Sequence, residues 1–469
     1  MLTEQPPTAD DTAAPAAPAR PGTWSALRPL VLRMHFYAGI LIAPFLLVAA
    51  ASGLLYALSF QAEKIVYRHE LEVPVGDRAV PLAQQVDAAR RAHPDNTVKA
   101  VWPAHEEGTT TRVLMTGPGV EEGRHLAVFV DPYTAEIRGA LPAYGSSGAL
   151  PLRTWLSELH RDLHLGEPGR VYSELAASWM WVVALGGLAL WLGRKRATKR
   201  ALFLPEGGPR SRRRTLSWHG TVGLWATAGL LGLSATGLTW STYAGENIGA
   251  LREQLGGVTP AVSAALDSAA TAGGGHEGHD GHGSGHAEAP AAPAQDIGID
   301  RAVRAAAEAG VSGQIAVATP TDVTGYVVKE MDRTYPVHLD AVALDPADGT
   351  VLDTVRYADY PLLAKLTSVG IALHMGTYLG LPNQLALALL ALAVVLLVVW
   401  GYRMWWLRRP GKPVPAGAWR KVPVTLLLPL AAVVALVGWF VPLLGLSLLA
   451  FLAIDGTRSL LARRRARTA

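Results

Sequence analysis

The chain has no cysteine among its 469 residues. Without thiol groups it cannot form disulfide bonds, bind zinc or iron–sulfur clusters through thiolates, or attach haem through a Cys-x-x-Cys-His motif. Any metal or cofactor chemistry must therefore rest on histidine, methionine or carboxylate side chains. The sequence also lacks a glycine-rich dinucleotide fingerprint after a strand, so a redox function would need electrons from another molecule.

Charged residues are scarce as well, at 17% of the chain, whereas 50% of the residues are hydrophobic. Several apolar runs approach the roughly 20 residues that are needed to span a bilayer. They cover residues 31–60, 175–192, 216–243 and 385–400, and a proline-interrupted stretch covers 422–454. We therefore predict a polytopic α-helical membrane protein with about six spans in the lipid bilayer.

Basic residues beside these runs predict the orientation, because cytoplasmic loops are enriched in lysine and arginine. With six spans, every basic cluster falls on one side of the membrane. Both termini are then cytoplasmic, and two large segments, at about 61–170 and 245–365, face outward. The formal net charge of +4 reflects these clusters, and we expect no nucleic-acid partner.

The two halves of the chain repeat each other, which indicates a tandem duplication. A His-x3-Gly-x13-Gly pattern begins at His35 in "RMHFYAGILIAPFLLVAAASGLLY" and at His219 in "SWHGTVGLWATAGLLGLSATGLTW". Farther along, one constant offset aligns "DPYTAEI" with "DPADGTV" and His160 with His374. The same offset aligns Gly166 with Gly380, Pro168 with Pro382, Gly187 with Gly401, Trp191 with Trp405 and Arg194 with Arg408.

Each repeat is therefore expected to contain a span, an outer α+β domain, an interfacial helix with a histidine, and a second span. The outer segments support this, because each begins with helical periodicity and ends with strand-like alternation. Helices are predicted at 81–94 and 300–310, and strands at 97–104, 111–117, 125–139, 313–320, 325–331 and 337–353. The turns at "DPYTAEI" and "DPADGTV" predict a hairpin at the end of each outer domain. The full predicted order is a disordered cytoplasmic segment (1–29), the first span (30–60), outer domain 1 (61–150), an interfacial helix and second span (151–193), a basic loop (194–214), the third span (215–243), outer domain 2 (244–360), an interfacial helix and fourth span (361–404), a basic loop (405–421), a two-span hairpin (422–456) and a basic tail (457–469).

This topology predicts two histidine pairs at two depths. His35 and His219 each begin an outward-running span, near the cytoplasmic face, whereas His160 and His374 each precede an inward-running span, near the outer face. Two facing imidazoles are the minimum needed to ligate one haem b axially, so the pairs predict two haems. Repeated glycines fall at the same two levels, where a missing side chain would admit a porphyrin: Gly53 and Gly237 at the outer level, about 27 Å along the helix from His35 and His219, and Gly187 and Gly401 at the inner level.

Simpler interpretations of these residues remain open. A histidine at a membrane interface is commonly an interfacial polar residue, and a glycine in a span is commonly a helix-packing contact. The symmetry of the four histidines favours function, because ionisable groups in membrane segments are functional candidates. His164 follows His160 by four residues and is expected to share its helix face; we interpret it as a neighbour that hydrogen-bonds a haem propionate.

A second histidine cluster occurs in a glycine-rich insert at 273–288, "GGGHEGHDGHGSGH". Its spacing is typical of a flexible scavenger of metal ions, or of a linker without a binding function. The candidate metal ligands are His276, His279, His282 and His286.

At "DPYTAEI", "LHRDLHLGEPGR", "SWHGTVG" and "LHMGTYLG", together with the first span, the chain resembles the PepSY-associated transmembrane family, over roughly residues 30–408. This resemblance implies that the outer domains are PepSY-like and that the protein is similar to bacterial iron-uptake membrane proteins and ferric-siderophore reductases. It implies haem ligands at His35, His219, His160 and His374, electron transfer across the bacterial cytoplasmic membrane from a cytoplasmic or quinol donor, and reduction of ferric-siderophore or another iron chelate outside. No residue is predicted to act directly in catalysis. The alternatives are a non-redox sensor or scaffold that uses the PepSY-like domains, and a protein that handles metal ions.

Overall fold

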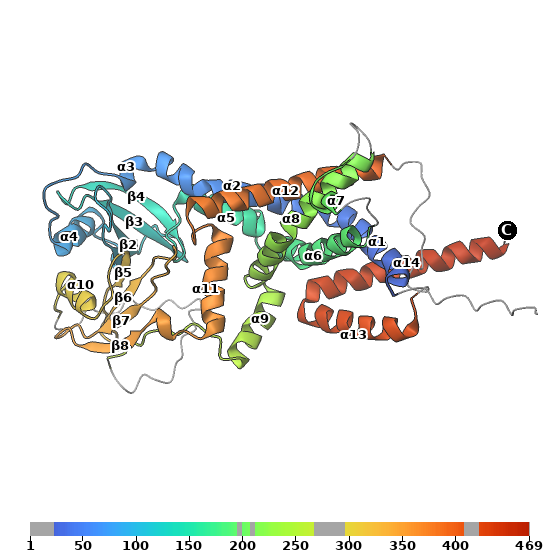
Figure 1. Cartoon of the computed structure of the whole chain (residues 1–469). Coiled ribbons are helices and arrows are strands. Elements are labelled where there is room, and N and C mark those ends of the chain that lie inside the picture. The colour runs from blue at the N-terminus through green and yellow to red at the C-terminus, as the bar shows by residue number, and fades with distance from the viewer. Residues whose placement is uncertain (1–22, 195–198, 207–211, 267–295, 408–421, 469) are drawn as a thin grey trace, which may run out of the picture.

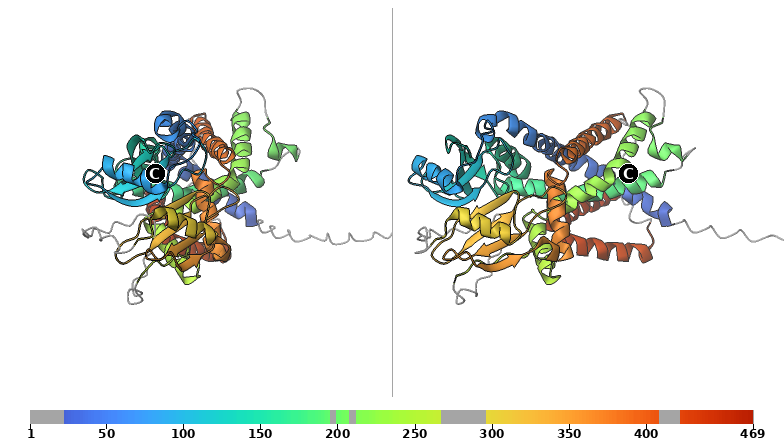
Figure 2. Two further views of the ribbon diagram at one scale, coloured as in Figure 1. Left: turned by 90° about the vertical axis from the view of Figure 1, so that its left-hand side faces the viewer. Right: turned by 60° about the vertical axis from the view of Figure 1, so that its left-hand side comes forward.

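The computed structural model describes residues 23–194, 199–206, 212–266, 296–407 and 422–468. A β-sheet with two short helices forms one end of the molecule, and long helices run from it toward the other end (Figure 1). The two further views agree with this division (Figure 2). The beginning of α1 and the C-terminal end of the chain both lie at the end opposite the sheet (Figure 1).

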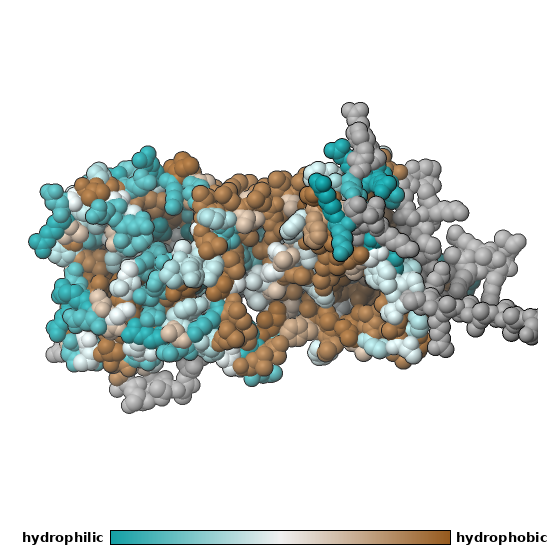
Figure 3. All heavy atoms as spheres, in the orientation of Figure 1, coloured by the Kyte–Doolittle hydropathy of each residue, from teal (hydrophilic) through white to brown (hydrophobic). Residues whose placement is uncertain are grey.

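Four described helices are long and apolar enough to cross a membrane. They are α2 (Ala43–Val66), α6 (Glu167–Leu192), α8 (Arg212–Leu238) and α12 (Leu381–Trp406). Most of their apolar surface faces outward rather than into the protein; for α12 only 11% of the apolar window is buried. Hydrophobic residues accordingly cover the surface of the helical part, whereas polar residues dominate over the sheet (Figure 3). The protein is therefore a multi-pass membrane protein.

The first apolar run forms two helices, because α1 (Thr23–Leu41) ends in a turn at Ile42 before α2 begins. The backbone continues across this turn, where Ile42 N–H donates to Ala38 O and Leu46 N–H donates to Ile42 O. The prediction of disorder up to residue 29 is wrong for residues 23–29, which belong to α1. Their order has a packing reason: a Cβ on Gly193 would lie 2.5 Å from the Trp24 indole, so this indole packs directly on the end of α6.

The duplicated sequence folds into duplicated structure. Helix α5 (Pro151–Asp162) precedes α6, and helix α11 (Leu362–Met375) precedes α12. Gly166 and Gly380 begin the two spans with nearly the same left-handed backbone, φ 63° and ψ −136° against φ 59° and ψ −132°. Only glycine adopts such a conformation readily, and the proline that follows suits the first helical turn. The repeated Gly-x-Pro motif therefore marks a sharp entry into each of these spans.

The outer segments confirm the predicted order of one helix followed by strands. The first contains α4 (Leu82–Ala92), β1 (Thr97–Trp102), β2 (Thr111–Thr116), β3 (Arg124–Val130) and β4 (Ile137–Tyr144), and the second contains α10 (Ile299–Glu308), β5 (Ile315–Ala318), β6 (Tyr326–Glu330), β7 (Ala341–Leu344) and β8 (Val351–Val355). The hairpins predicted at the two Asp-Pro turns are present as the antiparallel pairs β3–β4 and β7–β8.

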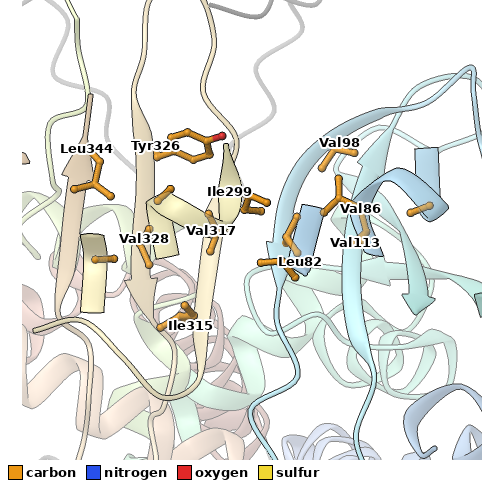
Figure 4. Packing of buried hydrophobic residues seen from close by; sticks show 14 of the residues in the cluster. Leu82, Val86, Val98, Val113, Ile299, Ile315, Val317, Tyr326, Val328 and Leu344 are labelled. Carbon is orange, nitrogen blue, oxygen red and sulfur yellow. The ribbon is translucent and has the colours of Figure 1, made fainter. Parts of the chain in front are cut away.

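The sequence analysis treats the outer domains as two modules, but their strands form one antiparallel sheet. Its order is β4-β3-β2-β1-β5-β6-β7-β8, and β1 pairs with β5 through Ala100 with Ala318 and Val101 with Val317. Helices α4 and α10 lie on the same face and share one core with the strands, as Leu82, Val86, Ile299 and others show in Figure 4. The two modules therefore fold as a single unit.

One carboxylate also links the modules. Pro81, the residue before α4, has no side-chain oxygen with which to cap this helix. Asp300 of α10 does so instead, since its two carboxylate oxygens accept hydrogen bonds from the backbone N–H groups of Leu82 and Ala83 at 2.7 and 3.0 Å. Helix N-termini favour such an acceptor, because their first N–H groups have no partner within the helix.

The C-terminal part forms a helical hairpin of α13 (Val424–Phe440) and α14 (Pro442–Thr468). The two helices approach closely at Gly438 and Gly445, where a Cβ on Gly445 would lie 2.4 Å from the Gly438 carbonyl oxygen. The hairpin is tied to the other helices by a buried ion pair between Arg33 and Asp455 and by a hydrogen bond from Trp179 Nε1 to Ser447 Oγ. At 17 residues, α13 is shorter than the four candidate spans. The remaining elements are α3 (Arg68–Leu71), α7 (Arg200–Phe203), α9 (Tyr243–Gln254) and the 3-10 turn η2 (Tyr357–Asp359).

Candidate cofactor site

His35 of α1 and His219 of α8 face each other between the helices. Their ring centres lie 6.3 Å apart, with an angle of 75° between the ring planes. Two imidazoles on opposite sides of one metal ion have ring centres about 6 Å apart, since a metal–nitrogen bond is about 2 Å long and the ring centre lies about 1 Å farther. The separation of this inner pair therefore fits axial ligation of one metal-containing cofactor.

Glycines of two other helices lie against these rings. A Cβ on Gly187 of α6 would lie 2.9 Å from Cε1 of His35, a distance that real side chains almost never adopt. A Cβ on Gly401 of α12 would lie 3.9 Å from Cε1 of His219, which is an ordinary contact. The sequence analysis assigns these glycines to a porphyrin, and the contacts give them the further role of accommodating the imidazoles.

The outer pair consists of His160 of α5 and His374 of α11, which lie close enough to each other to interact electrostatically. A Cβ on Gly53 would lie 3.2 Å from Cε1 of His160, and one on Gly237 would lie 3.6 Å from Cε1 of His374. The Trp240 indole and the His374 ring make a T-shaped contact, with 5.2 Å between ring centres. The structure thus gathers the eight predicted residues into two groups of two histidines and two glycines.

In all four histidines a hydrogen bond engages Nδ1. His35 Nδ1 lies 3.0 Å from Val183 O, and His219 Nδ1 lies 3.1 Å from Leu397 O. In the outer pair the partners are hydroxyl oxygens: Ser52 Oγ at 2.9 Å from His160 Nδ1, and Thr236 Oγ1 at 2.7 Å from His374 Nδ1. His160 makes a further backbone hydrogen bond with Ala49. Orientation of a ligating histidine through its second nitrogen is the usual arrangement at metal centres.

A buried ion pair positions the helix that carries His160. Arg153 of α5 lies 2.8 Å from Glu63 of α2, and the other Glu63 oxygen accepts a hydrogen bond from Leu150 N–H at the start of α5. Arg112 of β2 lies near this pair. Burial and the charge of Arg153 lower the pKa of Arg112 to about 10, so this guanidinium stays charged at neutral pH. The Glu63 carboxylate therefore fixes the start of α5 against α2.

Side-chain amides hold the other outer helix. Asn383 and Gln384, at the start of α12, donate hydrogen bonds to Leu373 O and Gly376 O at the end of α11. Gln61 of α2 in turn donates to Gln384 Oε1 at 2.8 Å. The last carbonyls of a helix have no partner within it, so these amides complete the turn that carries His374.

The expectation that His164 shares a helix face with His160 is wrong. Helix α5 ends at Asp162, and both Leu163 and His164 adopt left-handed backbone conformations that turn the chain away from the helix. The His164 ring lies against Trp155, with 4.9 Å between ring centres, and its Nδ1 is 3.6 Å from Glu158. This turn redirects the chain within a few residues, from the end of α5 to the Gly-x-Pro motif that begins α6.

The ligand arrangement that the described residues offer is therefore the histidine pair. Among them, no group of three or more histidine, aspartate or glutamate side chains is placed to hold a bare metal ion. His276, His279, His282 and His286 lie outside the described residues. Sequence reasoning missed Ser52, Thr236, Glu63 and Arg153; for the two hydroxyls a signal existed, since each directly precedes a repeated glycine, in Ser52–Gly53 and Thr236–Gly237.

The four candidate spans and the α+β sheet define a class: membrane proteins whose duplicated helices carry one α+β domain. The model of the family described as "PepSY-associated TM region" matches residues 32–408, and the chain belongs to this family. The matched region contains both histidine pairs and the whole sheet, whereas α13 and α14 lie beyond it. No curated protein matches the chain.

Proposed function

We propose that the chain is a di-haem b protein with six spans and cytoplasmic termini in the bacterial cytoplasmic membrane. In this proposal it passes electrons outward from a cytoplasmic or quinol donor and reduces ferric siderophore or another ferric chelate at the outer face. The observation that carries it is the presence of two histidine pairs, each with both Nδ1 atoms hydrogen-bonded and each with two glycines beside the rings.

Haem b held between two imidazoles supplies a one-electron carrier. His35 and His219 would hold the inner haem, and His160 and His374 would hold the outer one. The protein's own part is to orient these rings through their Nδ1 bonds and to leave space beside them at the four glycines. It also fixes the two helices that carry the outer pair, α5 against α2 through the Glu63–Arg153 ion pair and α11 against α12 through the amides of Asn383 and Gln384.

The test is haem quantification on the purified full-length protein in detergent, by a reduced-minus-oxidised spectrum and the pyridine haemochrome method. We expect two b-type haems per chain, and a loss of about one in His35→Ala and in His160→Ala. His338→Ala is the matched control, since this histidine is exposed on the sheet domain, where its Nδ1 lies 3.8 Å from Asp332. Reduction of a ferric chelate by the haem-loaded protein is then the activity assay.

A wild-type protein without haem, made in haem-replete cells, would refute the redox function. The sheet domain would then favour the alternative of a membrane sensor or scaffold, because its shared core forms from residues that do not include the histidine pairs. Metal-ion handling by the insert at 273–288 would be tested separately, by zinc and copper titration of the protein with and without that insert.

A further inference from the structure

The two histidine pairs differ in what holds their Nδ1 atoms. At the inner level the acceptors are peptide carbonyls, Val183 O and Leu397 O. At the outer level a hydroxyl lies on each Nδ1, that of Ser52 or Thr236, and His160 makes a further backbone hydrogen bond with Ala49. Both copies of the repeat place a hydroxyl on the outer histidine, so the hydroxyl is a property of this level and not of one helix.

The proton of each hydroxyl can be located from its other contacts. Ser52 Oγ lies 2.8 Å from Val48 O, and Thr236 Oγ1 lies 2.7 Å from Gly232 O, one turn earlier in its own helix. A carbonyl can only accept, and a hydroxyl has one proton to donate. Each hydroxyl therefore donates to its own helix, as serine and threonine in helices commonly do, and its oxygen accepts the Nδ1 hydrogen of the histidine.

This assignment gives the outer histidines the same tautomer as the inner ones. His35 and His219 must carry their hydrogen on Nδ1, because a carbonyl oxygen accepts it. His160 and His374 carry theirs on Nδ1, because the hydroxyl proton is already used. In a neutral imidazole with hydrogen on Nδ1, the lone pair is on Nε2, which is the atom that would face a metal.

We propose that Ser52 and Thr236 are positioning residues that set the reduction potential of the outer haem above that of the inner haem. This inference rests on the proposed function. A hydrogen bond from Nδ1 makes a ligating imidazole a stronger electron donor to its metal, and a neutral hydroxyl is a weaker acceptor than a peptide carbonyl. His374, whose Nδ1 partner is the Thr236 hydroxyl, therefore stabilises the ferric state less than an inner histidine does, and the potential difference drives electrons outward.

The experiment is a spectroelectrochemical titration of the full-length, haem-loaded protein and its variants. Ser52→Ala and Thr236→Val remove the acceptor, and we expect each to raise the midpoint of one haem while the other stays unchanged. A tenfold weaker preference for the ferric state corresponds to a rise of about 59 mV for a one-electron couple. The reduction step that survives in His160→Ala identifies the inner haem. The step that shifts in Ser52→Ala and Thr236→Val must be the other one, and its midpoint in the wild type must be higher than that of the inner haem.

Matched controls and conservative variants separate this role from a general effect on folding. Ser59→Ala in α2 and Thr227→Val in α8 remove hydroxyls that, among the described residues, donate to their own helices, at 2.6 Å from Tyr56 O and from Gly223 O. We expect both to leave the two midpoints unchanged. Ser52→Thr and Thr236→Ser keep a hydroxyl and should retain wild-type midpoints. Ser52→Cys, nearly the same size but a poorer acceptor, should shift the outer midpoint upward even if Ser52→Ala does not fold.

The outcomes distinguish the two proposals. Two bound haems with midpoints unmoved in Ser52→Ala, Ser52→Cys and Thr236→Val would overturn the positioning role and leave the proposed function standing. An outer step below the inner step would overturn the outward gradient. A wild-type protein without haem would remove the proposed function, and this inference with it.

Discussion

Gly187 and Gly401 occupy equivalent positions in the two repeats, yet we expect their replacement by alanine to have different effects. A Cβ at Gly187 would lie 2.9 Å from the His35 ring, whereas one at Gly401 would lie 3.9 Å from the His219 ring. Overpacking costs about 1–3 kcal/mol, and loss of the Nδ1 bond between His35 and Val183 costs about 0.5–1.5 kcal/mol. Alanine contributes about 1 kcal/mol in the opposite direction, because glycine is a poor helix former.

The balance of these terms destabilises Gly187→Ala by about 0.5–3.5 kcal/mol, while Gly401→Ala is neutral or stabilised by up to about 1 kcal/mol. Thermal unfolding of the two variants in the same detergent measures the difference directly, and haem content provides a second readout. At the outer level, Gly53→Ala should fall between these two variants and Gly237→Ala should behave like Gly401→Ala, following their distances of 3.2 and 3.6 Å. The reasoning is refuted if Gly187→Ala unfolds at the same temperature as Gly401→Ala, or at a higher one, with equal haem content.

Three further predictions concern the sheet and its junction with the helices. Glu63→Ala leaves Arg153 buried without its partner and should cost about 3–5 kcal/mol, whereas Glu72→Ala breaks an exposed pair with Arg68 and should cost about 0–1 kcal/mol; equal unfolding temperatures would contradict the role of the buried pair. Asp300→Ala removes the cap of α4 and should cost about 1 kcal/mol of stability, with faster hydrogen exchange at the first amides of α4. Glu308→Ala, an exposed change on α10, the helix that also carries Asp300, is the control. Unchanged exchange in Asp300→Ala would rule out the cap. Burial, and second the charge of Lys99, lower the pKa of His125, so the folded state prefers the neutral ring. The stability that the neutral His125 ring contributes is complete above about pH 6.5 and is lost as the pH falls through the lowered pKa. His125→Phe should therefore lose less of its unfolding temperature on acidification than the wild type, and parallel curves would exclude this assignment.

The sequence was sufficient to predict elements whose cause is local or repeated. Helical periodicity at α4 and α10, and the Asp-Pro turns of the β3–β4 and β7–β8 hairpins, depend on nearby residues, so their patterns are visible in the chain. The duplication also identified the four histidines, because chance does not repeat spacings of this length. Asp300 shows the limit of this reasoning. In sequence it is an acidic residue near a helix start, and only the folded chain places it at the beginning of a helix from the other module.

Other features depended on contacts between distant segments and could not be predicted. Pairing of β1 with β5 requires two strands from different repeats to become neighbours, and each strand alternates equally well with or without that partner. The match of each glycine to a histidine on another helix depends on helix rotation, which spacing alone does not determine. His164 was misassigned because four-residue spacing suggests a shared helix face, whereas the left-handed turn needed before Gly166 ends the helix first.

The pairing of β1 with β5 also determines the order in which the protein can mature during synthesis. β1 ends at Trp102 and β5 begins at Ile315, so the ribosome, at roughly 5–20 residues per second, needs on the order of 10 s or more to supply the partner strand. During that time the first half-sheet presents β1 as an unpaired edge, and such edges readily pair with other chains. Two membrane helices, α6 and α8, must also be inserted in the same interval. Aggregation therefore competes with completion of the sheet until β5 has been made, and a chaperone that covers β1 would reduce aggregation in this period.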